Sequence, residues 1–200
     1  MNRILHILNP TGQGGAGARA WDAYRAACEG ALDASRLAVT ERPGHARELA
    51  AGASDADVVV AVGGDGTVGE VMSGRMDRPE PRPLLGIVPA GTGNDIARDL
   101  GIGSVADAVA ALQARKTRPI DVVRADCSRD GEPIHQYGYL FGLVGFSATP
   151  MLKPWMKRFL GAAGAYYLAT LLQYLVYRPP RMTVRVDAQV FEGRFWMVIV

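Results

Sequence analysis

The chain has 200 residues, 48% of them apolar, which suffices for one large globular domain or for one domain and part of another. Its 22 lysines and arginines nearly balance its 20 aspartates and glutamates. This balance excludes the strongly basic composition that is typical of nucleic-acid-binding domains, so we expect no nucleic-acid partner.

In residues 1–116, strand patterns alternate with helix patterns. Strands are predicted at 3–8, 36–40, 57–62 and 83–88, and helices at 18–32, 44–53, 65–74, 94–99 and 104–114. The strand at 57–62 (DVVVAV) shows no alternation of polar and apolar residues, as expected for a strand that is buried on both faces. The alternation of strands and helices predicts a three-layer α/β fold in which helices cover a parallel sheet.

The pattern changes near Arg118, where a β-rich unit is predicted to begin. A β-hairpin is predicted from 118–126 and 134–144, a long helix from 154–177, and two antiparallel strands from 182–188 and 193–200. We therefore expect one domain at 1–116 and the start of a second domain at 117–200. Because the apolar strand at 193–200 reaches the last residue, we expect the second domain to be incomplete in this sequence.

Each of the four predicted strands is followed by residues that suit ligand binding. Three of these segments are loops at Asn9–Gly17, Gly63–Thr67 and Pro89–Asp95, and Thr40 ends the remaining strand. Because the carboxyl ends of parallel strands lie at one edge of a sheet, where ligands bind, we expect the four strand ends to converge on one ligand. The first loop contains a GxGxxG spacing, but no acidic residue ends the next strand, and the chain has no Walker A lysine. These absences disfavour a dinucleotide fingerprint and exclude a P-loop.

The GGDGT loop is typical of phosphate binding except for its acidic residue, Asp65. The two glycines before it let the backbone approach a ligand closely, and the helix that starts at Gly66 presents free N–H groups that favour phosphate. Asp65 has two interpretations. It caps the start of its own helix, or it binds a hydroxyl group or a Mg²⁺ ion that holds the phosphates.

Two longer motifs resemble a known family. GGDGTVGEV at 63–71, followed by LGIVPAGTGNDIARDLGI at 85–102, resembles the diacylglycerol kinase catalytic domain, whose superfamily also contains bacterial lipid kinases and sphingosine and ceramide kinases. NPTGQGG from Asn9 and TERPGHA from Thr40 resemble the first two nucleotide loops of that family. GGDGT alone also occurs in NAD kinases and phosphofructokinases, whereas PAGTGNDIAR favours the lipid kinases.

The resemblance implies a nucleotide-binding domain of the NAD kinase and phosphofructokinase type at 1–116, followed by an antiparallel β-sandwich-like domain. It implies a lipid kinase that transfers the γ-phosphoryl group of ATP to the hydroxyl group of a diacylglycerol-like lipid, with ATP and Mg²⁺ as cofactors. Two alternatives stay open. One is a kinase with a soluble acceptor such as NAD, and the other is a fragment that binds nucleotide or lipid without catalysis.

Matching the family motifs to this sequence assigns roles to residues in each loop. The implied nucleotide-binding residues are Asn9, Pro10, Thr11, Gly12, Thr40, Gly63, Gly64, Asp65, Gly66, Thr67, Val68, Gly69 and Thr92. Glu70, Gly91, Asn94 and Asp95 are assigned to the cleft or to the acceptor substrate. Asp65 is the candidate catalytic residue, the proton acceptor is expected outside this chain, and no metal ligand is identified. Gly69 stands where the family commonly has asparagine, which removes one amide contact.

The lipid substrate implies contact with a membrane surface. From Met151 onward seven lysines and arginines outnumber two acidic residues, and MLKPWMKRFL at 151–160 combines aromatic and basic side chains as interfacial segments do. The uncharged run at 159–177 reaches the length of a membrane span, but its glycines, tyrosines and glutamine favour a buried or half-buried helix. Two cysteines without metal-ligand spacing are typical of a reducing compartment. We therefore expect a cytoplasmic protein that contacts the inner membrane face peripherally, with a homodimer left open.

Overall fold

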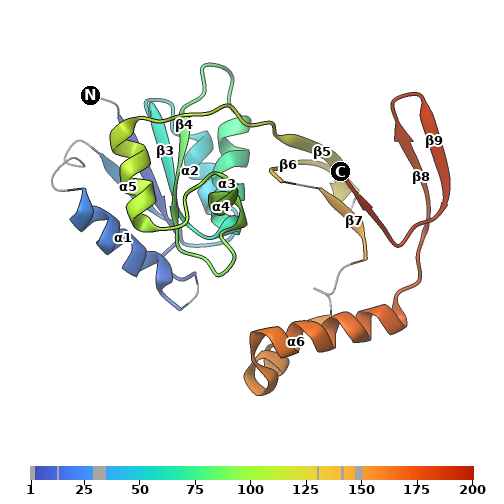
Figure 1. Cartoon of the computed structure of the whole chain (residues 1–200). Helices are drawn as coiled ribbons and strands as arrows, with labels where there is room; N and C mark the ends of the chain where they lie inside the picture. The colour runs from blue at the N-terminus through green and yellow to red at the C-terminus, as the bar shows by residue number, and fades with distance from the viewer. Residues whose placement is uncertain (1–2, 13, 29–34, 130, 141, 147–150) are drawn as a thin grey trace. The chain divides into compact units, whose positions relative to one another are not determined.

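Four parallel strands form the centre of the N-terminal unit (Figure 1). They are β1 (Ile4–Leu8), β2 (Arg36–Val39), β3 (Val58–Gly63) and β4 (Leu84–Pro89), in the order β2-β1-β3-β4. The structure is a computed structural model that describes residues 3–12, 14–28, 35–129, 131–140, 142–146 and 151–200. Every residue of β3 is buried, because this strand has neighbours on both sides and helices on both faces. The predicted parallel α/β sheet is confirmed.

Helices cover both faces of this sheet. On one face lie α1 (Ala16–Ala27) and α5 (Val105–Ala114), and on the other lie α2 (His45–Ala51), α3 (Asp65–Met76) and α4 (Asp95–Asp99). Alternate residues of β3 belong to the two cores: Val58, Val60 and Val62 pack with α1 and α5, whereas Val59 and Ala61 pack with α2, α3 and α4. The predicted three layers therefore form.

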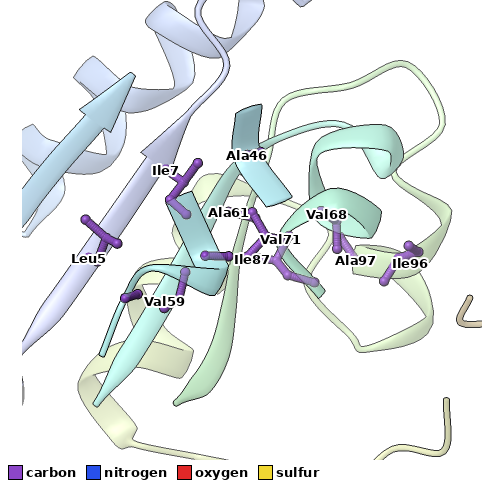
Figure 2. Packing of buried hydrophobic residues seen from close by; sticks show 12 residues of the cluster. Leu5, Ile7, Ala46, Val59, Ala61, Val68, Val71, Ile87, Ile96 and Ala97 are labelled. Carbon is purple, nitrogen blue, oxygen red and sulfur yellow. The ribbon is translucent and has the colours of Figure 1, made fainter. Parts of the chain in front are cut away.

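Figure 2 shows the core beneath α2, α3 and α4. Ala46, Val71 and Ile96, one from each helix, join Ile7 and Ile87 of the sheet in one buried cluster. This packing fixes the first turns of α3 and α4 at the carboxyl edge of the sheet, from which the loops project.

The chain forms two compact units, Met1–Leu140 and Phe141–Val200. In the second unit, β7 (Leu143–Gly145) pairs with β10 (Met197–Ile199), β8 (Arg181–Val186) pairs with β9 (Gln189–Arg194), and α6 spans Pro154–Val176. Both pairs are antiparallel. The predicted change to antiparallel pairing in the C-terminal part of the chain is thus confirmed.

A hairpin of β5 (Val123–Arg129) and β6 (Glu132–Gly138) belongs to the first unit. His135 of β6 holds it there: its carbonyl oxygen accepts from the Arg47 Nη1 of α2 at 3.2 Å, and its Nε2 lies 2.8 Å from the Oδ1 of Asp77, which follows α3. Antiparallel pairing thus begins shortly after the predicted domain boundary at 116, and the division of the chain into these two domains stays a prediction.

Two details of the C-terminal prediction are wrong. The segment between the strands predicted at 182–188 and 193–200 is not a turn but part of β9. The turn lies earlier, directly after β8, because Asp187 adopts a left-handed backbone (φ 52°) there. The long helix contains a break at Gly161, whose φ of 70° favours glycine. The predicted end of the first helix at 32 and position 141 of the hairpin prediction lie outside the described residues.

In the part of the chain that the structure describes, no helix is both long and apolar enough to cross a membrane.

Gly74 lets α3 pack directly against the backbone of α2. A Cβ atom at Gly74 would lie 2.1 Å from the Arg47 carbonyl oxygen and 2.9 Å from the Ala50 Cβ. Gly69, on the same helix, has open space at the corresponding position. The two glycines therefore allow a matched test of how closely the helices approach.

We predict that Gly74→Ala lowers the free energy of unfolding by about 1–3 kcal/mol, because the new methyl group overlaps the α2 backbone. Gly69→Ala should raise it by up to about 1 kcal/mol, because alanine favours a helix more than glycine does. Urea unfolding followed by circular dichroism measures both differences. Equal effects of the two substitutions would contradict the close approach of α2 and α3.

The side chain of His6 in β1 is buried against aromatic residues of α1. Its Nε2 lies 3.4 Å from the Tyr24 hydroxyl oxygen, and its ring centroid lies 5.0 Å from that of Trp21. Burial disfavours the charged imidazolium and lowers the pKa of His6 from 6.5 to about 4. The unfolded chain therefore binds more protons than the folded chain between these two pH values.

We predict that His6 makes the fold less stable in acid. Its unfavourable contribution is absent above about pH 6.5 and grows by on the order of 1 kcal/mol per pH unit until the pH reaches about 4. Urea unfolding at about pH 7 and about pH 5, compared with His6→Gln, isolates this effect because glutamine does not titrate. The same pH dependence in His6→Gln as in the parent would contradict it.

Candidate functional site

The four strand-end loops of the first unit enclose a cleft of about 590 Å³. The described residues that line it are, from the first loop, Asn9, Thr11 and Gly12; from the second, Thr40, Glu41, Arg42, Pro43 and Ala46; from the third and α3, Gly64, Asp65, Gly66, Thr67 and Glu70; and from the fourth, Ala90, Gly91, Thr92 and Gly93. The loops meet because the parallel strands end at the same edge of the sheet. A second cavity of about 330 Å³, beside α5, has mainly apolar walls and no acidic residue among its described lining. The strand-end cleft is therefore the candidate site.

Asn9 shapes the first loop and ties it to α3. Its Oδ1 accepts hydrogen bonds from the Gly12 N–H at 3.2 Å and the Thr11 hydroxyl at 3.3 Å. Its Nδ2 donates to the Thr67 Oγ1 at 3.1 Å. Both ends of the Asn9 amide are thus engaged within the protein, which fixes the loop at the mouth of the cleft.

Glu70 of α3 holds the second loop. Its Oε1 accepts the Gly44 N–H at 2.9 Å, and its Oε2 accepts the Ala46 N–H at 3.2 Å. Helix α2 begins between these two residues and has no side-chain cap in its own N-cap residue. A carboxylate from another helix therefore satisfies the first turn of α2.

Asp65 caps α4 and not its own helix. Its Oδ1 accepts the Ile96 N–H at 3.1 Å, in the first turn of α4. The interpretation of Asp65 as the cap of α3 is wrong, because the capping position belongs to Gly64, whose extended backbone precedes the helix. The Oδ2 atoms of Asp65 and Asp95 lie 3.0 and 3.2 Å from the position that a Cβ on Gly93 would occupy. Two carboxylates therefore border the space beside this glycine.

The third and fourth loops touch at Gly64 and Gly91. A Cβ on Gly91 would lie 2.6 Å from the Gly64 Cα and 2.8 Å from the Asn94 Oδ1. Asn94, which has a left-handed backbone (φ 50°), closes the fourth loop: its Oδ1 accepts the Gly91 N–H at 2.7 Å, and its Nδ2 donates to the Gly91 oxygen at 2.9 Å. A side chain at either glycine would push the two loops apart.

The lining of the cleft carries more negative than positive charge. Glu41, Asp65 and Glu70 are acidic, and Arg42 is the basic residue among the described lining. Arg42 is already paired with Glu48 of α2 through hydrogen bonds of 2.9 and 2.6 Å, which raise the pKa of Arg42 and lower that of Glu48. Among the described residues, no cluster of three or more histidine, cysteine or acidic residues could hold a metal. A cation that accompanies an anionic ligand would reduce the repulsion between the ligand and these carboxylates.

Most of the residues predicted for the site line the cleft. Those that do not are Pro10, Gly63, Val68, Gly69, Asn94 and Asp95. Val68 is buried in the core and donates its backbone N–H to the Gly64 oxygen at 3.0 Å, so it presents no donor to a ligand. The lining residues that the sequence analysis missed are Glu41, Arg42, Pro43, Ala46, Ala90 and Gly93. All of them lie within the TERPGHA and PAGTGND motifs. Assigning every residue of these two motifs to the site would therefore have identified them.

Comparisons with known proteins agree with this architecture. The family model described as the diacylglycerol kinase catalytic domain matches residues 3–125. A diacylglycerol kinase from Bacillus subtilis is 31% identical over 150 residues, which cover 72% of this chain and 46% of that protein. A protein named probable lipid kinase YegS-like, from Chromohalobacter salexigens, is 38% identical over 144 residues, which cover 70% of this chain and 44% of that protein.

A crystal structure of a diacylglycerol kinase from Bacillus anthracis str. Sterne has the same fold. It matches 99% of this chain and 63% of that chain, with a TM-score of 0.69 and 28% sequence identity. The chain spans about half the length of the curated relatives it matches.

We predict that Asn94→Ala lowers the free energy of unfolding by about 1–3 kcal/mol, because it removes two hydrogen bonds and places alanine in a left-handed backbone. Asn94→Gly loses the same bonds but tolerates that backbone, so it should cost about 1 kcal/mol less. Urea unfolding of both variants measures the two contributions. If neither variant is destabilised, the fourth loop does not depend on Asn94.

Proposed function

The chain belongs to the family of the diacylglycerol kinase catalytic domain, and on this premise we propose that it forms the nucleotide-binding part of an ATP-dependent lipid kinase. The kinase would transfer the γ-phosphoryl group of ATP to the hydroxyl group of a diacylglycerol-like lipid. The observation that carries the proposal is the position of Asp65, which holds α4 with one carboxylate oxygen and has the other beside Gly93 at the cleft. Relatives that are named diacylglycerol kinase or lipid kinase support it.

The start of α3 suits the phosphates of ATP. Gly66 is exposed there, and the N-terminus of a helix offers N–H groups and the positive end of its dipole to an anion. Gly64 and Gly91 carry no side chains, so the backbones of both loops can approach the phosphates closely. We therefore assign the phosphates to the third and fourth loops.

Mg²⁺ fits the acidic character of this region. Asp65 and Asp95 border the same space beside Gly93, and their carboxylate oxygens are ligands that hard cations prefer. Mg²⁺ commonly binds through one or two carboxylates together with phosphates and water, so these two side chains would suffice. When bound, the ion supplies neutralisation of the phosphate charge.

The proposed reaction is a direct phosphoryl transfer. The bond between the γ-phosphorus and its bridging oxygen in ATP breaks, and a new bond forms from that phosphorus to the lipid oxygen. The hydroxyl proton passes to a general base. We place this base outside the four loops, because Asp65 and Asp95, the two carboxylates beside Gly93, are assigned to Mg²⁺. The residues of the cleft would bind and orient the nucleotide.

We further propose that the start of α6 meets the membrane that contains the lipid. Trp155 and Phe159 are 54% and 77% exposed. Lys153 and Arg158, also exposed, add positive charge to the same segment. Aromatic and basic side chains together suit an anionic lipid surface. The protein would be cytoplasmic and would contact the inner membrane face peripherally, as a single chain or as a homodimer.

We predict that Asp65→Asn lowers kcat/KM for ATP-dependent phosphorylation of diacylglycerol by at least about 100-fold, because it removes a negative charge beside the phosphates and their cation. The asparagine oxygen can still accept the Ile96 N–H, so the fold should be retained. The measurement is the transfer of labelled phosphate from ATP to diacylglycerol in vesicles, with the full-length protein. NAD serves as the competing soluble acceptor.

Asp55→Asn is the matched control for this test. Asp55 is exposed, pairs with Arg36 and lies before the start of β3, at the opposite edge of the sheet. Phosphorylation of NAD and not of lipid would overturn the choice of acceptor. ATP binding without transfer to either acceptor would indicate a non-catalytic module. Full activity of Asp65→Asn would overturn the role of Asp65.

A further inference from the structure

Glu70 lies in the cleft, yet both of its carboxylate oxygens are used inside the protein. They accept the N–H groups of Gly44 and Ala46 at 2.9 and 3.2 Å. We propose that Glu70 is a positioning residue that fixes the second loop, residues 40–46, and that it does not itself bind metal or substrate. The proposal rests on the proposed ATP site, because the loop that Glu70 holds lines the same cleft.

Glu70 binds the second loop at the end that joins α2. Its strand end is held by the Thr40 N–H, which donates to the Leu8 oxygen at 2.8 Å and continues the pairing of β1 with β2. Inside the loop, the Glu41 N–H donates to the His45 Nδ1 at 3.2 Å. The helix end is held by the Glu70 carboxylate and also by Arg42, whose guanidinium pairs with Glu48 of α2. Without the Glu70 carboxylate, the first turn of α2 would have to find water as its partner.

The negative charge of Glu70 also interacts favourably with the N-terminus of α2. A carboxylate near the N-terminus of a helix is stabilised by the free N–H groups and by the helix dipole. A metal ion or a substrate hydroxyl would have to compete with two backbone donors for the same oxygens. This arrangement favours a structural use of the carboxylate over coordination of a ligand.

The effect on the nucleotide would be indirect. Thr40, Glu41 and Arg42 belong to the loop and line the cleft. If the Glu70 contact is lost, the Arg42–Glu48 pair is left to hold this end of the loop, so the loop is less ordered before ATP binds. Part of the binding energy of ATP is then spent on ordering the loop. Loss of Glu70 should therefore weaken ATP binding more than it slows the chemical step.

Amide hydrogen exchange in the nucleotide-free chain tests the contact directly. Glu70→Ala should raise the exchange rates of the Gly44 and Ala46 amides at least about 10-fold, because both of their acceptors are lost. Glu70→Gln, which keeps one acceptor oxygen, should raise them less. Glu80→Gln removes an exposed carboxylate from the connection between α3 and β4 and should leave both rates unchanged.

Steady-state kinetics give a second test, because a general loss of stability would not raise KM for ATP selectively while leaving kcat nearly unchanged. In Glu70→Ala, KM for ATP should rise about 10-fold while kcat stays within about threefold of the parent. Unchanged exchange of both amides together with a large fall in kcat would overturn the proposal in favour of a direct role in catalysis.

The two proposals can fail separately. If the protein transfers phosphate to no lipid, the proposed function fails, but amide exchange and the dissociation constant for ATP still decide the role of Glu70. Unchanged exchange in Glu70→Ala would overturn that role even in an active lipid kinase. If Glu70→Ala does not fold, Glu70→Gln allows the same comparison with a smaller expected change.

Discussion

Three side chains on the first two turns of α3 hold the candidate site together. Thr67 binds Asn9 of the first loop, Glu70 binds the backbone of the second, and Asp65 binds the start of α4 after the fourth. Three of these four hydrogen bonds are accepted by carboxylates, and such bonds contribute more than bonds between neutral groups. The loops of β1, β2 and β4 are thus attached to one helix, and the shape of the cleft follows from the position of α3.

The position of α3 is fixed by its surroundings at both ends. Val71 packs in the core, and Gly74 lies against the α2 backbone. At the start of the helix, the Thr67 side chain occupies the place that a Cβ on Gly63 would need, at 2.6 Å. The buried strand can therefore turn into the helix at this point because Gly63 has no side chain. The same glycine cluster that first indicates phosphate binding is also a requirement of the fold.

Local patterns in the sequence predicted the parallel sheet, its helices and the meeting of the loops at one edge, because alternation, burial and strand direction decide these features. The same patterns could not predict the partners of Asp65 and Glu70. Their hydrogen bonds join residues 24 to 31 positions apart, and no local spacing links them. The break at Gly161 and the turn at Asp187 were missed for a different reason. Each depends on one residue with a left-handed backbone inside a segment whose composition favours a regular element.

The contact between Gly64 and Gly91 makes the tolerance of one motif to substitution depend on another motif that is well separated in the sequence. A side chain on either glycine would have to occupy the same narrow space between the third and fourth loops. Once a first substitution has forced the loops apart, a second one meets less resistance, so the two costs are less than additive. The effect of a substitution in one motif therefore depends on the residue present in the other, although no local spacing in the sequence links the two.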